Sequence, residues 1–292
     1  MPEIRIGTCS WKYDSWKGIV YSEGVGRNYL REYAEKFDTV EIDQWFWSLH
    51  GPGRVSLPDR AAVSDYASSV PAGFRFSVKV PDSITLTHFR KKSKTDPLVR
   101  NPHFLSVDLF DDFLAGIEPL RKNLGPLIFQ FEYLNKLKMP SQDAFQEAFG
   151  AFIRKCPSGY VYCVETRNPK FLNAGFFSFL DGNGLHPVFL QGYYMPPIFD
   201  IFRDHADKIR GPAVLRLHGP DREGMEEKTG GSWNRIVAPK DEELERIAEM
   251  AWSLLKREVS VYFNVNNHYE GCAPLTIEKI RRLMKRQFRV TG

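Results

Sequence analysis

Short hydrophobic runs of strand length alternate along the chain with segments whose apolar residues recur every three or four positions. The runs are rich in β-branched and aromatic residues, which is typical of strands, and the longer spacing is typical of amphipathic helices. The runs begin at Ile4, Thr39, Phe74, Pro126, Val161, His186, Ala213 and Val259. The clearest helical patterns cover residues 28–37, 103–124, 141–156, 241–258 and 275–288. Eight strand and helix pairs in regular alternation predict an α/β fold, a single (β/α)8 TIM-type barrel.

No linker and no shift in composition divides the 292 residues, so one barrel domain over residues 1–292 is expected. Ser141 and Asp241 are expected to cap the helices that follow them. Enlarged loops are expected after strands 3, 6 and 7, and they begin at residues 81, 193 and 220. In a TIM barrel these connections lie on the face where the strands end, which is the face that carries active sites.

Charged and amide side chains gather on one parity near the ends of the expected strands. Alternate residues of a barrel strand point into the barrel, so residues of one parity share its interior. The residues on this parity include Glu41, Lys79, Gln130, Glu165, Arg167, Arg216, His218 and Asn264. Structural ion pairs, such as Glu165 with Arg216, are an open alternative for each of them. The group as a whole favours a binding site, because burying charge is costly and a barrel needs few internal charges to fold.

Composition changes this picture little. Hydrophobic residues make up 42% of the chain, enough for a substantial core, and a formal net charge of +4 is too small to indicate a nucleic-acid or membrane partner. The four cysteines show no metal-binding spacing, which fits reduced thiols. No apolar run approaches a membrane span and no apolar leader follows Met1, so a soluble, cytoplasmic protein without a membrane partner is expected.

A series of motifs along the chain resembles the YecE-like family, also known as domain of unknown function 72. The motifs are GTCSWKYDSWKGIVY, VEID, FRFSVKVPDSIT, GPLIFQFE, VETRNPKF, LRLHG and YFNVNNHYEGCAPLT. They cover nearly the whole chain in the family's order, and the resemblance implies a TIM-type barrel but no particular reaction. The positions that match the family's polar motifs are Thr8, Trp11, Trp16, Glu41, Lys79, His88, Gln130, Glu165, Arg167, Arg216, His218, Asn264, Asn267 and His268.

The leading hypothesis is an enzyme with a polar, partly cationic pocket that acts on a small anionic or sugar-like ligand. Lys79, Arg167 and Arg216 are expected to hold a phosphate or carboxylate. Glu41 and Glu165 are expected to serve as general acid and base, which suits a hydrolase, an isomerase or a lyase. The expected catalytic residues are Glu41, Lys79, Glu165 and His218. The expected substrate-binding residues are Thr8, Trp11, Trp16, His88, Gln130, Arg167, Arg216, Asn264, Asn267 and His268.

Three alternatives stay open. No cofactor is predicted, although Glu165, His218 and His268 could together hold a single divalent metal ion. The basic runs at residues 90–94 and 279–289 could contact nucleic acid, with phosphodiester cleavage as the reaction. A barrel that binds a ligand without turnover fits the amide-rich strand ends as well, because Asn and Gln both donate and accept hydrogen bonds. The sequence leaves the oligomeric state open.

Overall fold

Eight strands form one closed barrel, and each neighbouring pair runs parallel. The computed structural model describes residues 2–24, 26, 28–51, 53–91 and 93–291. The barrel strands are β1 (Ile4–Cys9), β2 (Thr39–Ile42), β5 (Arg75–Lys79), β6 (Leu124–Phe131), β7 (Val161–Thr166), β8 (His186–Gly192), β9 (Ala213–Gly219) and β10 (Val261–Val265). Each strand begins within two residues of its expected start. The predicted (β/α)8 TIM-type barrel is confirmed.

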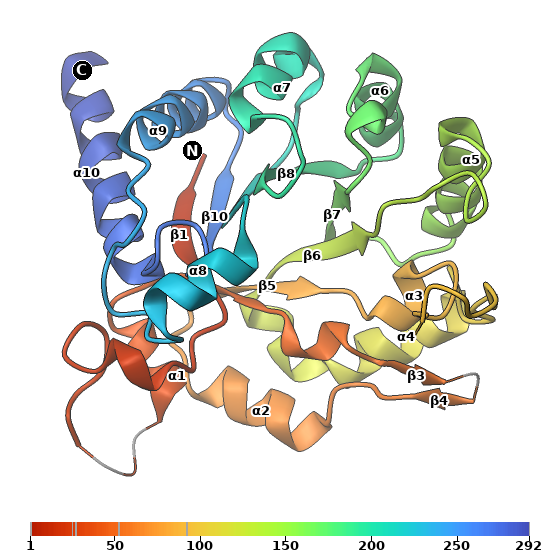
Figure 1. The fold of residues 1–292 in the computed structure, drawn as a ribbon, viewed down its shortest axis with the longest axis horizontal. Helices are drawn as coiled ribbons and strands as arrows, with labels where there is room; N and C mark the ends of the chain where they lie inside the picture. Colours follow the sequence, from red (N-terminus) through yellow and green to blue (C-terminus); the bar gives the residue numbers. More distant parts are fainter. Residues whose placement is uncertain (1, 25, 27, 52, 92, 292) are drawn as a thin grey trace.

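Helices surround the strands, and one main helix follows each barrel strand (Figure 1). These helices are α1 (Tyr29–Ala34), α2 (Arg60–Ser68), α4 (Val107–Gly116), α5 (Gln142–Ile153), α6 (Ala174–Gly182), α7 (Ile198–His205), α9 (Asp241–Lys256) and α10 (Ala273–Thr291). None of the helices in the described ranges has the length and apolar character needed to cross a membrane.

One of the two expected helix caps is confirmed and the other is wrong. The Ser141 side chain accepts a hydrogen bond from the Ala144 backbone N–H at 3.1 Å and so caps α5. Asp241 is the first helical residue of α9 rather than its cap. The residue before it, Lys240, is held from outside the helix, because its backbone N–H donates to Glu270 at 2.7 Å. Asp241 adds negative charge to the first turn, which complements the helix dipole, and it pairs with Lys279 of α10.

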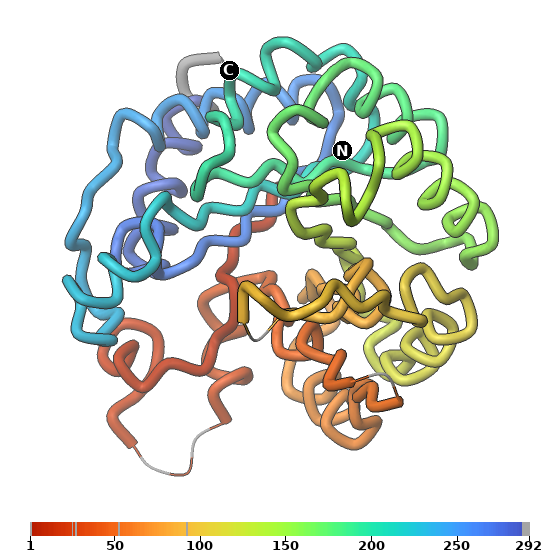
Figure 2. Tube along the Cα trace, turned by 45° about the vertical axis from the view of Figure 1, so that its right-hand side comes forward, coloured from red at the N-terminus to blue at the C-terminus, as the bar shows by residue number. Residues whose placement is uncertain are grey.

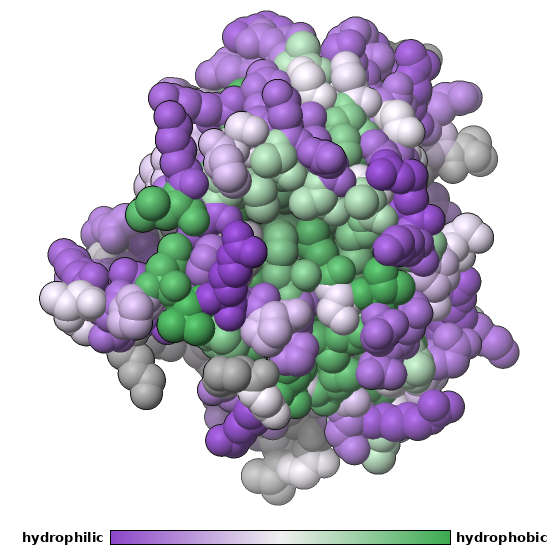
Figure 3. Space-filling model, turned by 90° about the vertical axis from the view of Figure 1, so that its right-hand side faces the viewer, coloured by the Kyte–Doolittle hydropathy of each residue, from purple (hydrophilic) through white to green (hydrophobic). Residues whose placement is uncertain are grey.

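The layer between barrel and helices is built largely from phenylalanine. The ring centroid of Phe129 in β6 lies 5.3 Å from that of Phe149 and 5.8 Å from that of Phe152, both in α5. Phe110 of α4 lies 5.4 Å from Phe129. These rings are buried, with exposed fractions of 3% or less. The outer surface on the side where Figure 1 has α5 and α3 also shows apolar side chains at its centre, surrounded by hydrophilic ones (Figure 3). This packing fixes the strands whose ends carry the polar residues.

The barrel interior has its own small apolar cluster, separate from the outer layer. It is formed by the buried side chains of Ile128, Cys163, Val188 and Val214, with Val161 and Tyr262 packed beside them. These residues come from β6, β7, β8, β9 and β10. The interior is therefore filled with side chains, as in other barrels of this size.

The connections at the strand ends carry additional short elements. The connection after β2 contains the 3₁₀ helix η2 (Gln44–Phe46) and a hairpin of β3 (Leu49–Gly51) and β4 (Arg54–Val55), which the sequence did not predict. The expected loop after β5 holds α3 (Asp82–Thr85) and then a segment that reaches across the middle of Figure 2. The expected loop after β9 contains α8 (Arg222–Thr229). Lys92, in the basic run at residues 90–94, lies outside the described residues.

Candidate active site

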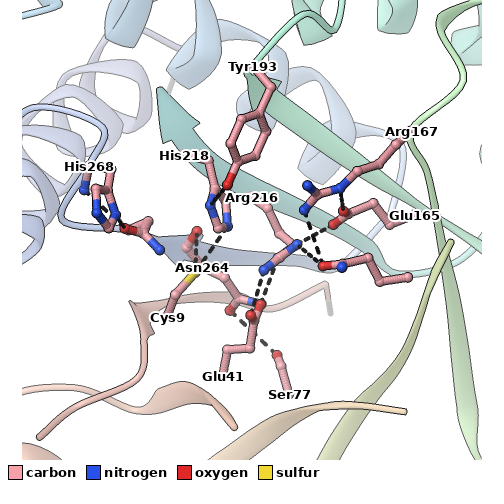
Figure 4. Close-up of polar contacts among 12 residues, drawn as sticks. Cys9, Glu41, Ser77, Glu165, Arg167, Tyr193, Arg216, His218, Asn264 and His268 are labelled. Carbon is pink, nitrogen blue, oxygen red and sulfur yellow. Dashed lines mark hydrogen bonds and ion pairs between the residues drawn. The ribbon is translucent and has the colours of Figure 1, made fainter. Parts of the chain in front are cut away.

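Arg216 of β9 lies at the centre of a buried ion-pair network inside the barrel (Figure 4). Its Nε and Nη2 donate to the two carboxylate oxygens of Glu41 at 2.8 and 2.7 Å. Its Nη1 donates to Glu165 and, at 3.2 Å, to the amide oxygen of Gln130. The structural ion pairs that the sequence left open are therefore present, and the expected parity brings these four side chains together. We call Glu41, Gln130, Glu165, Arg167, Arg216 and Asn264 the polar floor.

The polar floor extends around the barrel from Glu165 and Glu41. Arg167 donates from Nε to Glu165 at 3.0 Å and from Nη2 to Gln130 at 3.3 Å. The Asn264 amide donates to Glu41 at 2.9 Å. Burial alone would raise the pKa of Glu165, but Arg216, Arg167 and Lys79 outweigh it and hold that pKa at about 2. Glu165 therefore stays ionised at neutral pH and is a poor proton donor.

A cavity of about 500 Å³ opens above the polar floor, at the C-terminal ends of the strands. Six of the expected site residues line it, and they are Lys79, Gln130, Arg167, Arg216, His218 and His268. Its walls are rich in aromatic side chains, including Tyr13, Phe46, Trp47, Tyr133, Tyr193 and Tyr194. A volume of this size suits a small molecule. The location agrees with the rule that TIM barrels carry their active sites at this end.

Six expected binding residues do not line this cavity. Asn264 belongs to the polar floor, and the other five are Thr8, Trp11, Trp16, His88 and Asn267. The Thr8 hydroxyl pairs at 2.9 Å with the hydroxyl of Tyr33, a residue of α1, so this side chain turns toward the helix layer. Asn267 accepts a hydrogen bond from the Ala273 backbone N–H at 2.9 Å, at the start of α10. Both side chains have structural partners, so the structure offers no reason to place them in the site.

The remaining three residues of this group also lie elsewhere. Trp16 is fully buried, with its ring centroid 4.6 Å from that of Tyr13. Trp11 meets Tyr66 edge-on and borders a different hollow. The His88 ring nitrogen Nδ1 lies 2.9 Å from the Thr87 hydroxyl. A matching sequence motif does not reveal on which side of the backbone a side chain lies.

Lys79, the last residue of β5, differs from the other cations of the cavity. It is only 6% exposed, and within the described ranges no hydrogen bond or ion pair reaches its Nζ. The Nζ lies 3.8 Å from the ring centroid of Phe46, a contact typical of a cation over an aromatic face. Burial, with the neighbouring Arg216 second, lowers the pKa of Lys79 from 10.5 to about 8. Lys79 is therefore a buried amine that can gain or lose a proton near neutral pH.

Asp43 directly follows β2, the strand next to β5, at the same level as Lys79. The register pairs Ile42 with Val78, and Asp43 and Lys79 are the residues that follow them. Asp43 lines the cavity, and its carboxylate has no side-chain partner in the described part of the chain. Burial, and then the charge of Glu41, raise the pKa of Asp43. The cavity therefore contains an acid and a base whose pKa values are shifted toward each other.

His218 connects two further residues, Cys9 and Tyr193, at the edge of the polar floor (Figure 4). Its Nε2 lies 3.7 Å from Cys9 Sγ and its Nδ1 lies 3.3 Å from the Tyr193 hydroxyl. Burial raises the pKa of the Cys9 thiol well above its usual value, and burial together with Arg216 lowers the pKa of His218. Both groups are therefore neutral, and this arrangement lacks the thiolate that a cysteine nucleophile needs.

Tyr193 reaches His218 because two glycines allow β8 and β9 to approach closely. At Gly192, with φ of 136°, a Cβ atom would lie 2.4 Å from the carbonyl oxygen of Gly219. The Tyr193 backbone N–H donates to that same oxygen at 2.9 Å. No side chain larger than glycine fits at residue 192, so this close approach sets the position of Tyr193.

His268 is held by α8 rather than by the polar floor. Its Nε2 lies 3.0 Å from a carboxylate oxygen of Glu226, which also accepts from Arg222 at 2.9 Å. Its Nδ1 pairs with the Asn266 side chain. Glu165 has its carboxylate on Arg167 and Arg216, so the metal-binding trio of Glu165, His218 and His268 is not assembled. Across the described residues no group of three or more His, Cys, Asp or Glu side chains is placed to hold a metal ion.

Several residues of the cavity were absent from the expected site. Tyr13, Phe46 and Arg222 come from connections after β1, β2 and β9, whose path over the barrel the strand pattern does not specify. Asp43 and Asn266 could have been included, because each lies two residues beyond a polar residue of the same parity, Glu41 and Asn264. The alternation of side chains along a strand therefore predicts both residues, provided that it is continued one residue past the end of each strand.

Comparisons with known proteins identify the fold and a family whose function is unknown. A family model described as "Protein of unknown function DUF72" matches residues 5–291, which confirms the resemblance seen in the motifs. A DUF72 family protein from Enterococcus faecalis V583 has a TM-score of 0.69 at 18% identity, over 97% of this chain and 95% of that chain. A DUF72 family protein from Thermotoga maritima MSB8 has a TM-score of 0.67 at 22% identity, over 97% of this chain and 99% of that chain. No curated protein matches the chain.

Proposed function

The chain belongs to DUF72, a family of proteins of unknown function, and we propose that it is an enzyme that binds a small anionic or sugar-like substrate at the mouth of its barrel. The observation that carries this proposal is Lys79, a buried cation in the cavity for which the described residues supply no counter-ion in contact. Burying an ammonium group is costly unless a partner compensates it. A bound anion or a reacting substrate group supplies that partner.

Other cations of the cavity support an anionic substrate. Arg167 uses its Nε and Nη2 on Glu165 and Gln130, while its Nη1 makes no bond to the described residues. The guanidinium lies 4.8 Å from the Tyr193 ring centroid, which fixes its plane. A guanidinium fixed in this way presents a free N–H edge, which suits a phosphate or carboxylate. The tyrosine and tryptophan walls offer flat apolar faces of the kind that sugar rings pack against.

The geometry supports Lys79 and Asp43 as the proton-transfer pair. A general acid or base works best when its pKa lies near the working pH, and the pKa of Lys79 is lowered to about 8 while that of Asp43 is raised. Glu41 and Glu165, the pair expected from the sequence, are instead bound to Arg216. In this proposal they hold the guanidinium in place beneath the cavity. Proton transfer by such a pair suits an isomerase or a lyase.

A thermal-shift screen of the wild type tests the proposal. We expect phosphorylated sugars or small carboxylates to raise the melting temperature, because a ligand of the native state stabilises it by mass action. The Lys79→Met variant should lose this shift. Lys240→Met is the matched control, since Lys240 also lies over an aromatic ring, 5.8 Å from the Tyr269 centroid, but outside the cavity. An equal shift in wild type and Lys79→Met would contradict the proposal.

Nucleic-acid binding is the second candidate, and one observation favours it. A second cavity of about 480 Å³ shares Arg90 and Glu132 with the first and is lined by the basic residues Lys91, Lys94 and Lys138. Proteins that bind single-stranded DNA or RNA combine a row of cations with aromatic side chains on which the bases stack. Binding of a short single-stranded DNA that weakens steeply with added salt, and weakens further in Lys94→Glu, would support this candidate.

A further inference from the structure

We infer that Lys79 is a nucleophile that forms an imine with the carbonyl carbon of a small compound carrying an anionic group, such as a phosphorylated ketose or aldose or a 2-oxo acid. The inference rests on the proposed function of the same cavity and narrows its substrate class from anionic or sugar-like molecules to anionic carbonyl compounds. It also adds a covalent step at a named atom, Nζ of Lys79.

The surroundings of Nζ leave its lone pair available for attack. Within the described ranges no hydrogen bond or ion pair reaches Nζ, which lies over the face of Phe46 at 3.8 Å from the ring centroid. Other lysines of the molecule are paired differently. Lys279, for example, contacts Asp241 and Glu270 at 2.5 and 2.8 Å. A carboxylate partner stabilises the protonated form of a lysine. A lysine that faces an aromatic ring and an open cavity lacks this stabilisation and loses its proton more readily.

Two conditions activate a lysine as a nucleophile, and Lys79 meets both. The first is removal from water, and the second is a neighbouring positive charge. Lys79 is 6% exposed, and the guanidinium of Arg216 lies among its charged neighbours. With its pKa lowered to about 8, about one Lys79 in ten is a free amine at pH 7, roughly 300 times the fraction for an ordinary lysine.

Asp43 can supply the proton that imine formation requires. The amine lone pair of Lys79 attacks the carbonyl carbon, and proton transfer from nitrogen to the carbonyl oxygen gives a carbinolamine. The hydroxyl of that intermediate takes a proton from the Asp43 carboxyl group and leaves as water, while the nitrogen lone pair forms the C=N bond. In sum, one carbonyl group, one amine and one proton give one protonated imine and one water. Asp43 directly follows the adjacent strand β2 at the level of Lys79 and lines the same cavity, and its raised pKa makes it a suitable donor.

The anionic group of the substrate has cations available in the same cavity. Arg167 offers its free N–H edge, and Arg222 of α8 also lines the cavity. Arg222 is bound to Glu226 on its own helix at 2.9 Å. Arg167 is therefore the stronger candidate for contact with the anion, because Glu165 and Tyr193 hold it in a fixed orientation.

Borohydride trapping tests the inference, because it reduces an imine to a stable amine. The wild type is incubated with dihydroxyacetone phosphate, glyceraldehyde 3-phosphate or pyruvate, then reduced, and the modified residue is identified by peptide mass spectrometry. We expect one of these probes to label Lys79 ahead of all other lysines at pH 7. Lys79→Arg should lose the label, while Lys240→Met should keep it. A probe without the anion, dihydroxyacetone, should label Lys79 less, and Arg167→Met should reduce labelling by the phosphorylated probe.

The outcomes separate this inference from the proposed function. A probe that raises the melting temperature of the wild type but leaves Lys79 unlabelled overturns the imine and leaves the binding site standing. Labels spread evenly over surface lysines also overturn it. If none of the three carbonyl probes binds or labels, the carbonyl class is wrong, and the proposed function is judged by the wider ligand screen. Because Lys79→Arg keeps a cation at this position, unchanged melting of that variant shows that loss of label is not loss of fold.

Discussion

Two neighbouring levels of the barrel interior have opposite character. Ile128, Cys163 and Val214 belong to the apolar cluster, and the residues two positions further along the same strands are Gln130, Glu165 and Arg216. Two residues of a strand span about 7 Å, so the interior changes from apolar to charged and amide side chains within that distance. The apolar level is what closing a barrel requires. The charged level carries a desolvation cost, and its benefit is a rigid base for the cavity above.

The largest expected effect comes from removing the shared cation. Arg216→Met leaves Glu41 and Glu165 buried without their counter-ion, and breaking a buried pair in this way costs about 3–5 kcal/mol of unfolding free energy. Denaturant unfolding measures the loss. Replacing both carboxylates as well, in Glu41→Gln/Glu165→Gln/Arg216→Met, should recover part of it. A loss below about 1 kcal/mol in the single variant would show that the polar floor relaxes easily.

Acid should weaken the polar floor selectively. Because the pKa of Glu165 falls from 4.5 to about 2 on folding, this carboxylate contributes about 3 kcal/mol of stability above pH 4.5, which is lost as the pH falls toward 2. Glu165→Gln should therefore show a smaller decrease in unfolding free energy between pH 5 and 3 than the wild type. Parallel pH profiles for the two proteins would contradict the assignment.

Lys79 should make the protein more stable as the pH rises above neutral. Its pKa is lowered from 10.5 to about 8 on folding, so the charged form destabilises the fold below pH 8, and stability should rise as the pH increases from 8 to 10.5. The charged groups around it are Arg216, Glu41, Glu165 and Asp43. We expect Lys79→Met to gain about 2 kcal/mol near pH 7 while losing ligand binding, the trade-off typical of active sites. Destabilisation by this variant would indicate a structural role.

The smallest effect is expected in the apolar level. Ile128→Val removes one buried methylene and should cost about 0.5–1.5 kcal/mol in denaturant unfolding. The thermal shift caused by ligands should stay at the wild-type value, because the polar residues above keep their contacts. A variant that loses ligand binding here would show that the two levels are coupled rather than separate.

The sequence predicted the strands and the polar floor for the same physical reason. Strands buried on both sides give continuous hydrophobic runs, and their period of two assigns Glu41, Gln130 and Glu165 to the interior without knowledge of the fold's details. The alternation of side chains along a strand does not predict which charged residues form ion pairs. The role of Arg216 as a shared partner of Glu41 and Glu165 needed the circular arrangement of strands, which brings β2, β7 and β9 around one axis.

The cavity walls could not be predicted in this way. Phe46, Tyr13 and Arg222 lie in connections whose conformation depends on contacts with distant parts of the chain. Thr8 and Trp16 belong to motifs shared with the family, yet their side chains pack away from the cavity. The proposed role of Lys79 depends on the lack of a hydrogen-bond or ion-pair partner among the described residues, and no sequence pattern reveals such a lack.

The connection after β2 supplies Asp43, Phe46 and Trp47 to the cavity, while the polar floor comes from the strands themselves. Phe46 lies over the amine of Lys79, with Nζ 3.8 Å from the ring centroid, and so contributes to the burial that lowers the pKa of Lys79. If the proposed function holds, insertion or exchange of residues in that segment would change the reactivity of Lys79 and the fit of the substrate together, while the folded core stayed the same. The connection after β2 can therefore vary in evolution or in protein engineering while the polar floor beneath it is kept.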